Sequence, residues 1–242
     1  MSSFLITGSS RGVGLELIRQ LADKPISEVQ TVFATARTNS APRFQELLRE
    51  HPERVIFVPL DITDESSVTR AVELVESKLD GNRLDVLINN AGVSKFGSLE
   101  EIERQRPSPI TNSFLPLLRK GNAKKIASIS TSVGSFALQE NFRNYPAPSY
   151  KISKAALNML TQLYSQSLDD EGFTVFCVSP GWLKTDMGGS GADLPVEMGS
   201  EATLDVVFKT GREGNGRFFN IHVPGWEKNP GLNQYDGGEL PW

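Results

Sequence analysis

The sequence predicts a single-domain α/β fold in which a doubly wound parallel sheet is covered by helices on both faces. Short apolar runs of strand length alternate along the chain with segments of helical period. Strands that alternate with helices in this way belong to parallel sheets. The length of 242 residues suits one α/β domain with a large core. We therefore predict one domain over residues 1–242.

The first part of the chain alternates regularly between the two kinds of element. A strand and a helix flank a glycine-rich turn at the N-terminus, and the third predicted helix has four apolar residues on one face, namely Val68, Val72, Val75 and Leu79. The predicted elements are strand Ser3–Thr7, helix Gly12–Asp23, strand Thr31–Ala36, a helical stretch at Phe44–Glu50, strand Val55–Leu60, helix Ser66–Leu79 and strand Leu84–Asn89.

The pattern is weaker after residue 90 and then returns. Leu99–Arg106 and Ile110–Lys120 are separated by Pro107-Ser108-Pro109, and Pro116 lies within the second of them. Strand Lys125–Ser130, a long loop, helix Ser149–Glu171 and strand Phe173–Ser179 follow.

Two segments nearer the C-terminus are predicted without regular structure. Met187–Ser200 is rich in glycine and is either a plain connection or a mobile substrate lid. We favour the lid, because loops that follow the carboxyl ends of strands border the ligand crevice of a doubly wound sheet. The tail, Gly225–Trp242, is expected to pack against the body of the protein.

Composition excludes several classes of partner. The net charge is -4 and no long run carries one sign, which argues against a nucleic acid or an anionic membrane. Cys177 is the only cysteine and lies in an apolar run, so we expect a small buried side chain and a reducing compartment. His51 and His222 lack metal-ligand spacing, and no metal site is predicted. Neither a signal peptide nor a membrane-spanning stretch is apparent, so a cytoplasmic protein is expected.

The glycine-rich turn is the first motif that carries chemistry. Gly8, Gly12 and Gly14 follow a predicted strand and open a helix. Glycines permit the tight turn and let the backbone approach a pyrophosphate, whose negative charge the free N–H groups of the helix start can bind. In this context the pattern predicts a dinucleotide site.

The next strand indicates which dinucleotide binds. An NAD site usually has an acidic residue about 20 residues beyond the glycines, whereas the segment Ala34–Thr38 contains none. Arg37 can pair with a 2′-phosphate, and Arg11 adds a second positive charge. We therefore predict NADP(H), with Thr38 also in the site. The alternative is that Arg37 is only solvated and the cofactor preference is loose.

Two further polar segments follow predicted strands directly. Asp61 stands where an adenine would lie, and Asn89-Asn90-Ala91-Gly92 supplies small residues where a ribose could pass. Either segment alone is compatible with ordinary turn chemistry. Both lie at carboxyl ends of parallel strands, as one shared crevice requires.

A tyrosine and a lysine form the predicted catalytic pair. Tyr150 and Lys154 are four residues apart and therefore share one helix face. A free phenol has a pKa near 10, and a nearby cation is expected to lower the pKa of Tyr150. Tyr150 would then donate a proton to a carbonyl oxygen while hydride arrives at the carbon. Thr131 or Ser132 would supply a hydroxyl that polarises this oxygen.

These motifs together resemble the classical short-chain dehydrogenase/reductases over nearly the whole chain. The matching motifs are Thr7-Gly8-x-x-x-Gly12-x-Gly14, Asn89-Asn90-Ala91-Gly92, Tyr150-x-x-x-Lys154 and Pro180-Gly181-x-x-x-Thr185. Within the family, Tyr150–Met159, Lys184–Gly189 and Asp236–Trp242 are similar to one branch. That branch holds C-factor-like and sniffer-like carbonyl reductases and norsolorinic acid ketoreductase-like proteins.

The resemblance implies a Rossmann-type sheet and a homodimer or homotetramer. It also implies that Val13, Asp61, Asn90, Tyr150, Lys154, Leu183 and Thr185 line the cofactor. In addition, it implies that Lys154 holds the nicotinamide ribose, and it aligns the family's catalytic serine with Thr131, leaving Ser132 as the fallback donor.

The chain departs from the family between Gly92 and Thr131. The family places a long helix there, which carries a catalytic asparagine and much of the subunit interface. Here prolines interrupt the segment, and Asn112 matches only the end of that helix. By comparison with the family, about a dozen residues are missing. Either another group completes the proton relay or activity is impaired.

Three functions remain open from the sequence. The favoured one is an NADPH-dependent reductase of a small-molecule ketone or aldehyde. The second is a non-catalytic NADP(H)-binding protein, which the shortened segment and Thr131 suggest. The third is a nucleotide-sugar epimerase or dehydratase, which normally needs a further substrate domain. The substrate itself is not readable from the sequence.

Overall fold

The computed structural model describes residues 1–92 and 110–242. They form two compact units, one of residues 1–92 and 110–126 and the other of residues 127–242. Both units consist of parallel strands alternating with helices, which confirms the predicted α/β class. Among the described residues, none of the helices combines the length and the apolar character that crossing a membrane requires.

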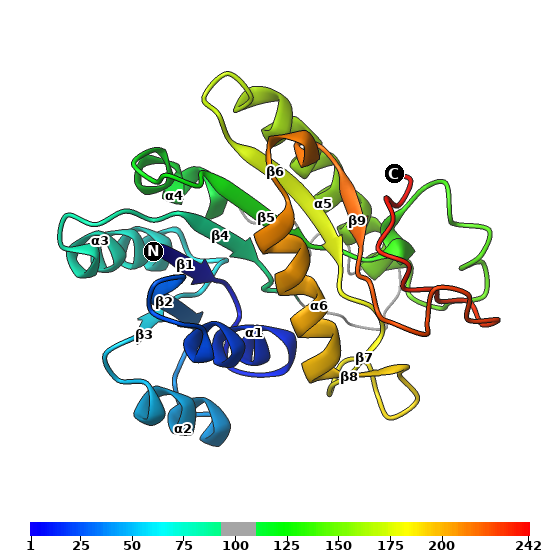
Figure 1. The fold of residues 1–242 in the computed structure, drawn as a ribbon, viewed down its shortest axis with the longest axis horizontal. Coiled ribbons are helices and arrows are strands. Elements are labelled where there is room, and N and C mark those ends of the chain that lie inside the picture. Colours follow the sequence, from blue (N-terminus) through cyan, green and yellow to red (C-terminus); the bar gives the residue numbers. More distant parts are fainter. Residues whose placement is uncertain (93–109) are drawn as a thin grey trace. The chain divides into compact units, whose positions relative to one another are not determined.

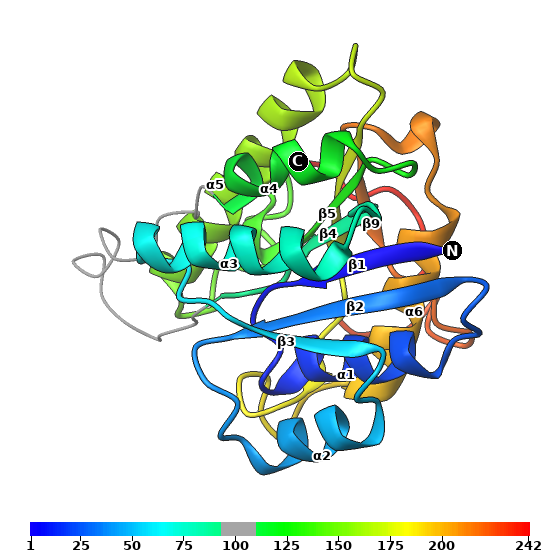
Figure 2. The ribbon, with the colours of Figure 1, turned by 90° about the vertical axis from the view of Figure 1, so that its left-hand side faces the viewer.

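The first unit contains the parallel strands β3-β2-β1-β4, in that spatial order. Residues Phe4, Leu5 and Ile6 of the first strand pair with β2 on one side and with β4 on the other. Figure 1 shows α3 on one side of these strands and α1 on the other, and α3 packs beside α4 (Figure 2). The elements are β1 Ser2–Ile6, α1 Gly12–Asp23, β2 Val29–Ala36, α2 Pro42–Glu50, β3 Val55–Pro59, α3 Glu65–Leu79, β4 Val86–Asn89 and α4 Ile110–Arg119.

A buried carboxylate joins three segments of this unit. Asp85 is 4% exposed and accepts hydrogen bonds from the backbone N–H groups of Ser3, Asn122 and Ala123. A carboxylate with several backbone donors is stable in the core, where an unpaired charge would be costly. Asp85 therefore connects the start of β1 to the turn that leads into β5 (Lys125–Ile129).

The second unit contains the order β5-β6-β9, with β6 parallel to β9. Helices α5 and α6 both pack on β6, and they lie on opposite sides of β6 and β9 (Figures 1 and 2). Cys177 of β6 is fully buried, as predicted. The remaining elements are the 3₁₀ turn η2 Ser132–Gly134, α5 Pro148–Ser167, β6 Thr174–Ser179, β7 Leu183–Lys184, β8 Leu194–Pro195, α6 Val196–Lys209, the 3₁₀ turn η3 Arg212–Gly214 and β9 Phe218–Asn220.

The structure corrects several predicted boundaries, among them the start of α2 at Pro42 instead of Phe44 and the start of β4 at Val86 instead of Leu84. β2 begins two residues earlier than predicted, and α5 ends at Ser167 instead of Glu171. The predicted lid, Met187–Ser200, is only partly a loop, because β8 and the first residues of α6 occupy its end. Helix α6 and strand β9 were not predicted. The predicted segments Leu99–Arg106 and 107–109 lie outside the described residues.

The tail packs against the second unit, as predicted. The N–H of Leu240 donates to the Phe218 carbonyl, and the ring of Trp242 stacks on the ring of Phe218 with centroids 5.3 Å apart. The Trp242 carbonyl also accepts a hydrogen bond from the N–H of Ala137. The tail thus extends along the outer side of β9.

Candidate active site

The glycine turn between β1 and α1 is built around close backbone contacts. Gly8 has φ +72° and Gly12 has φ +57°, a region that side chains disfavour. A Cβ atom at Gly8 would lie 2.8 Å from Cα of Ala91, and one at Gly14 would collide with the Gly8 carbonyl. The turn therefore needs glycine at these positions for its own shape.

Asn90 fixes this turn from the end of β4. Its Nδ2 donates to the carbonyls of Thr7 and Gly8 at 2.8 and 3.1 Å. In return, the Thr7 hydroxyl oxygen accepts from the N–H groups of Asn90 and Ala91, each at 2.9 Å. The predicted residues Gly8, Gly14 and Asn90 are thus brought together in the first unit.

The start of α1 fits a phosphate group. Arg11 is the N-cap residue and makes no side-chain cap, and the first turn contains no acidic residue. Gly12 and Val13 are the first residues of the helix, where backbone N–H groups have no intrahelical acceptor. Glycines without side chains, an uncapped helix start and the positive helix end together suit a pyrophosphate.

The ends of β2 and β3 carry the residues predicted for the adenosine side. Arg37 and Thr38 are exposed, directly after β2. Asp61 accepts hydrogen bonds from the N–H and the hydroxyl of Thr63, at 2.9 and 2.7 Å. These bonds, and to a smaller extent the guanidinium of Arg37, lower the pKa of Asp61. Arg37 therefore lies near enough to Asp61 to stabilise its carboxylate electrostatically.

Helix α5 places Tyr150 and Lys154 together in the second unit. Nζ of Lys154 lies 5.8 Å from the ring centroid of Tyr150 and donates to the Ile129 carbonyl at 2.7 Å. Ser153 does not compete, because its hydroxyl donates to the Tyr150 carbonyl. The ammonium thus lies over the phenol ring and is anchored at the end of β5.

The expected lowering of the Tyr150 pKa is wrong for this structure. Burial raises the pKa of Tyr150 to about 12, with a smaller contribution from Tyr145. Burial also lowers the pKa of Lys154, to about 8. The physical reason is that desolvation disfavours both charged forms, while the ammonium is bound to a backbone carbonyl and lies over the ring.

The two predicted hydroxyl donors lie in the turn that follows β5. Thr131 is the N-cap of η2, and its Oγ1 accepts from the N–H of Val133 at 3.3 Å. Ser132 is the first residue of η2. Gly134 ends this turn, and a Cβ atom there would lie 2.7 Å from Cβ of Lys154. The turn therefore rests directly on the helix that carries the tyrosine and the lysine.

The sequence interpretation missed a buried amide beneath this turn. Asn158 is 5% exposed, one helical turn after Lys154. Its Oδ1 accepts from the Ser130 hydroxyl at 2.5 Å, and its Nδ2 donates to the Gly134 carbonyl at 3.3 Å. A buried amide usually satisfies its polar atoms, and here both partners flank the turn. An asparagine four residues after the lysine was the available signal.

Leu183 and Thr185 lie in the loop after β6. Leu183 is buried and pairs with Leu194, so that β7 and β8 close the loop. Oγ1 of Thr185 accepts from the N–H of Gly188 at 3.1 Å. Both residues are therefore held in a compact loop of the second unit.

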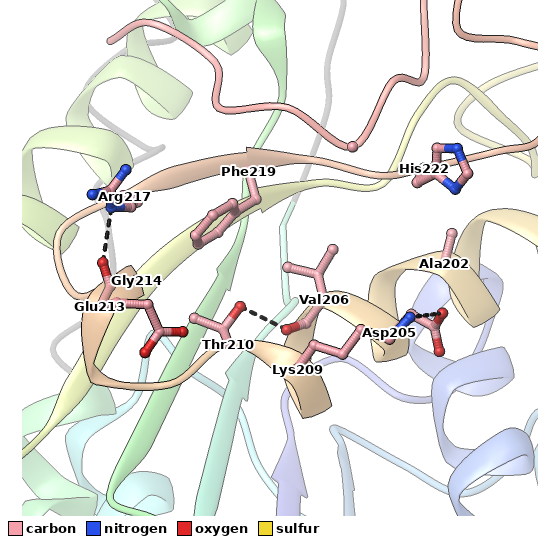
Figure 3. Close-up of a pocket in the computed structure, with 11 residues that line it drawn as sticks. Ala202, Asp205, Val206, Lys209, Thr210, Glu213, Gly214, Arg217, Phe219 and His222 are labelled. Atoms are coloured by element: carbon pink, nitrogen blue, oxygen red, sulfur yellow. Dashed lines mark hydrogen bonds and ion pairs between the residues drawn. The ribbon is translucent and has the colours of Figure 1, made fainter.

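A pocket lies within the second unit (Figure 3). It is bordered by α6, η3 and β9, and Phe219 and Val206 form its apolar part. Several of its polar groups already have partners: Lys209 pairs with Asp205, Arg217 with Glu239 and His222 with Glu227, and Glu213 accepts from the N–H of Gly211. It contains none of the predicted site residues.

Asn112, which matches only the end of the family's long helix, has an exposed side chain in this structure. It lies exposed in the first turn of α4, a helix that also contains Pro116. The neighbouring Thr111 is instead buried, and its hydroxyl oxygen accepts from Nδ2 of Asn89 at 3.1 Å. The predicted shortening before α4 falls within residues 93–109, outside the described part of the chain.

Comparisons with known proteins agree with this arrangement. The family model described as short chain dehydrogenase matches residues 3–193. C-signal of Myxococcus xanthus is 35% identical over 171 residues, covering 66% of this chain and 93% of the relative. NADPH-bound carbonyl reductase from chicken fatty liver is 30% identical with a TM-score of 0.84, over 100% of this chain and 98% of that one. Carbonyl reductase Sniffer of D. melanogaster is 28% identical with a TM-score of 0.85 and covers 100% of both chains.

The match to the family model covers far more than half of the chain, and the two solved structures share its Rossmann-type α/β fold along its whole length. The predicted resemblance is therefore confirmed, and the chain belongs to the short chain dehydrogenase family of oxidoreductases.

Proposed function

We propose that the protein is an NADPH-dependent reductase that converts a ketone or an aldehyde into an alcohol. The observation that carries this proposal is the pairing of Tyr150 and Lys154 on α5, beside the hydroxyl turn at 131–134. A protein that only bound a dinucleotide would not need a buried phenol next to a buried ammonium. The family membership and the NADPH-bound carbonyl reductase at 30% identity support the same reaction.

The glycine turn and the start of α1 are proposed to hold the pyrophosphate of NADP(H). Gly8, Gly12 and Gly14 keep the cradle clear of side chains, and Asn90 fixes its shape. Further members of the proposed site are Arg11, Val13, Thr38, Asp61, Leu183 and Thr185. Arg37 supports the phosphate-bearing cofactor, because the exposed guanidinium after β2 can form charge-assisted hydrogen bonds to a 2′-phosphate.

Each reacting group has a proposed role. When bound, the reduced nicotinamide supplies a hydride to the carbonyl carbon. Tyr150 donates its phenolic proton to the carbonyl oxygen, so that the alcohol forms and the phenol is later reprotonated from solvent. The high pKa of Tyr150 keeps the phenol protonated at neutral pH, as a proton donor requires. Thr131 or Ser132 donates a hydrogen bond to the same oxygen, and Lys154 holds the nicotinamide ribose.

The test is consumption of NADPH with a panel of aromatic ketones, quinones and aldehydes. NADH is run in parallel, and the alcohol product is identified. We expect the protein to oxidise NADPH in equal amount to the alcohol formed, and to prefer NADPH over NADH. Turnover with none of the carbonyls would contradict the proposal.

One observation favours a second candidate, a protein that binds NADP(H) without chemistry. The Thr131 oxygen already caps η2 through the N–H of Val133, and Lys154 is bound to the Ile129 carbonyl. Under this alternative, NADPH raises the melting temperature of the protein, but no carbonyl in the panel increases its oxidation.

A further inference from the structure

The loop after β6 closes on itself at a narrow neck. The two ends of the segment 182–194 lie next to one another, because the N–H of Leu194 donates to the Trp182 carbonyl at 3.1 Å. Within the loop, the Nε1 of Trp182 donates to the Gly188 carbonyl and the N–H of Gly189 donates to the Thr185 carbonyl. The loop carries Leu183 and Thr185, which the proposed function assigns to the cofactor.

One side chain from the tail binds both ends of this neck. The hydroxyl of Tyr235 donates to Oδ2 of Asp193 at 2.6 Å and accepts from the N–H of Trp182 at 3.1 Å. Asn233 adds a hydrogen bond from Nδ2 to the same carboxylate oxygen, at 2.7 Å. The neck is thus fastened by residues about 40 to 50 positions further along the chain.

Packing fixes Tyr235 in the place where it makes these bonds. Tyr235 is only 3% exposed, and its ring lies against the ring of Trp226 with the two centroids 5.4 Å apart. Gly181, which has φ +84°, brings the loop backbone close: a Cβ atom there would lie 3.1 Å from the Tyr235 ring. Two backbone hydrogen bonds also hold the segment itself: the N–H of Val223 donates to the Tyr235 carbonyl, and the N–H of Tyr235 donates to the Trp226 carbonyl.

We propose that Tyr235 and Asn233 are positioning residues that fasten the 182–194 loop through Asp193. Resting on the proposed function, the bonds hold Leu183 and Thr185 in the conformation that binds the nicotinamide half of the cofactor. A buried hydroxyl that forms hydrogen bonds to two separate groups, here the Asp193 carboxylate and the Trp182 N–H, restricts the motion of both. Without it, the neck keeps the short β7–β8 pairing and the Asn233–Asp193 bond but loses two hydrogen bonds, so the loop opens more often.

Limited proteolysis tests the fastening without any reference to activity. Lys184 is exposed but belongs to β7, which pairs with β8, so trypsin can cut the Lys184–Thr185 bond only when this pairing opens. We expect Tyr235→Phe, which keeps the ring, to accelerate this cut about 3- to 10-fold, the range that corresponds to one hydrogen bond. Asn233→Ala should accelerate it less, because the Tyr235 bonds remain. Cleavage is located by the mass of the fragments.

Tyr164→Phe is the matched control, because it makes the same chemical change on α5. We expect it to leave the rate of cleavage after Lys184 unchanged. If Tyr235→Phe behaves like Tyr164→Phe, or if the unmodified protein is already cut rapidly at Lys184, the inference is overturned.

Kinetics add a readout that general destabilisation would not give. At a temperature where every variant is folded, we expect Tyr235→Phe to raise KM for NADPH about 3- to 10-fold, with a smaller change in kcat. An unchanged KM would overturn the link to the cofactor. If no carbonyl is reduced, the proposed function fails, while the proteolysis result still decides whether Tyr235 fastens the loop.

Discussion

The glycine turn of the first unit and the Tyr150–Lys154 pair of the second unit differ in what their polar groups bind in the structure. In the turn, the amide of Asn90 and the hydroxyl of Thr7 bond backbone groups that set the shape of the turn, and the phosphate is proposed to bind the N–H groups at the start of α1 instead. On α5, the ammonium of Lys154 is instead bound to the Ile129 carbonyl, and burial shifts the pKa of both Tyr150 and Lys154 toward the neutral forms.

The proposed cofactor-binding turn therefore already has its final shape, whereas the proposed catalytic pair must exchange one hydrogen bond when the cofactor binds. The cradle in the first unit is rigid because its shape is set by backbone contacts that allow no side chain. The proposed reacting groups on α5 lie close together, but the ammonium keeps an internal partner, which the ribose would replace under the proposed function. We therefore expect substitutions in the turn to act on affinity and substitutions around α5 to act on turnover.

The largest effect is expected from Gly14→Ala. The added methyl would collide with the Gly8 carbonyl and approach the Asn90 amide, so the turn must open. We expect NADPH affinity to fall more than about 100-fold, since backbone contacts to the pyrophosphate would be lost. Isothermal titration measures this loss.

Gly81→Ala is the control for the glycine substitution. Gly81 has φ +81° and open space around its Cβ position, so alanine there costs about 1 kcal/mol of stability through backbone strain alone. Its NADPH affinity should stay unchanged. Equal losses of affinity in both variants would contradict the special role of the turn.

Asn158→Ala is expected to act mainly on turnover. The change leaves the Ser130 hydroxyl and the Gly134 carbonyl without their buried partner, which costs about 2–3 kcal/mol of stability. Because these groups flank η2, we expect kcat to fall about 10- to 100-fold with KM for NADPH unchanged. Steady-state kinetics well below the melting temperature measure the split.

Thr161→Val separates positioning from simple destabilisation. Thr161 is also buried on α5 and bonds the Ser128 hydroxyl and the Cys177 sulfur, neither of which belongs to η2. It should lower stability but preserve kcat. If both variants lose kcat in proportion to their stability, Asn158 has only a structural role.

Arg37→Ala is expected to change cofactor preference more moderately. The exposed guanidinium after β2 is the proposed partner of the 2′-phosphate, and an exposed charged hydrogen bond is worth about tenfold in affinity. KM should rise about tenfold for NADPH and stay constant for NADH. Arg49→Ala, on the exposed side of α2, is the control that should leave both values unchanged.

The smallest effect concerns pH. The pKa of Lys154 is lowered from 10.5 to about 8, so between these values the unfolded chain binds more protons than the folded chain. The contribution of Lys154 to stability must therefore rise with pH in this window, by about 1 kcal/mol between pH 7 and pH 9. Buried Cys177 and Tyr150, whose pKa values are raised, contribute in the opposite direction, so the rise is read as the difference from the Lys154→Met variant. Urea unfolding at several pH values measures the rise, and Lys154→Met should remove it. An identical pH dependence in both proteins would refute the burial of this ammonium.

Much of the fold was predictable because its signals are local. Helix α1 has the predicted bounds, since a glycine turn and a clear apolar face define it. Helix α6 was missed for a physical reason: the side of the helix that packs closely on the protein consists largely of small residues, among them Gly199, Ser200 and Thr203. A Cβ atom at Gly199 would collide with Leu183, so this helix requires a small residue at a position where prediction from hydrophobic periodicity relies on a large apolar one.

The site was predictable where a motif carries its own geometry. The glycines and the i, i+4 pair of Tyr150 and Lys154 are of this kind. The bonds of Asn158 to Ser130 and of Tyr235 to Asp193 join residues 28 and 42 positions apart, and no local pattern specifies them. The pKa of Tyr150 also depended on burial and on the nearness of Tyr145, which a local sequence pattern does not contain.

The most direct test of the central claim compares Tyr150→Phe with the unmodified protein, in two assays on the same sample. Phenylalanine keeps the ring beside Lys154 and removes the phenolic hydroxyl, and with it the proton that would be transferred. The account predicts that NADPH oxidation with a reducible carbonyl falls by about 1000-fold or more, while the NADPH dissociation constant changes less than about twofold. Retained turnover, or a parallel loss of affinity, would contradict the assignment of Tyr150 as the proton donor.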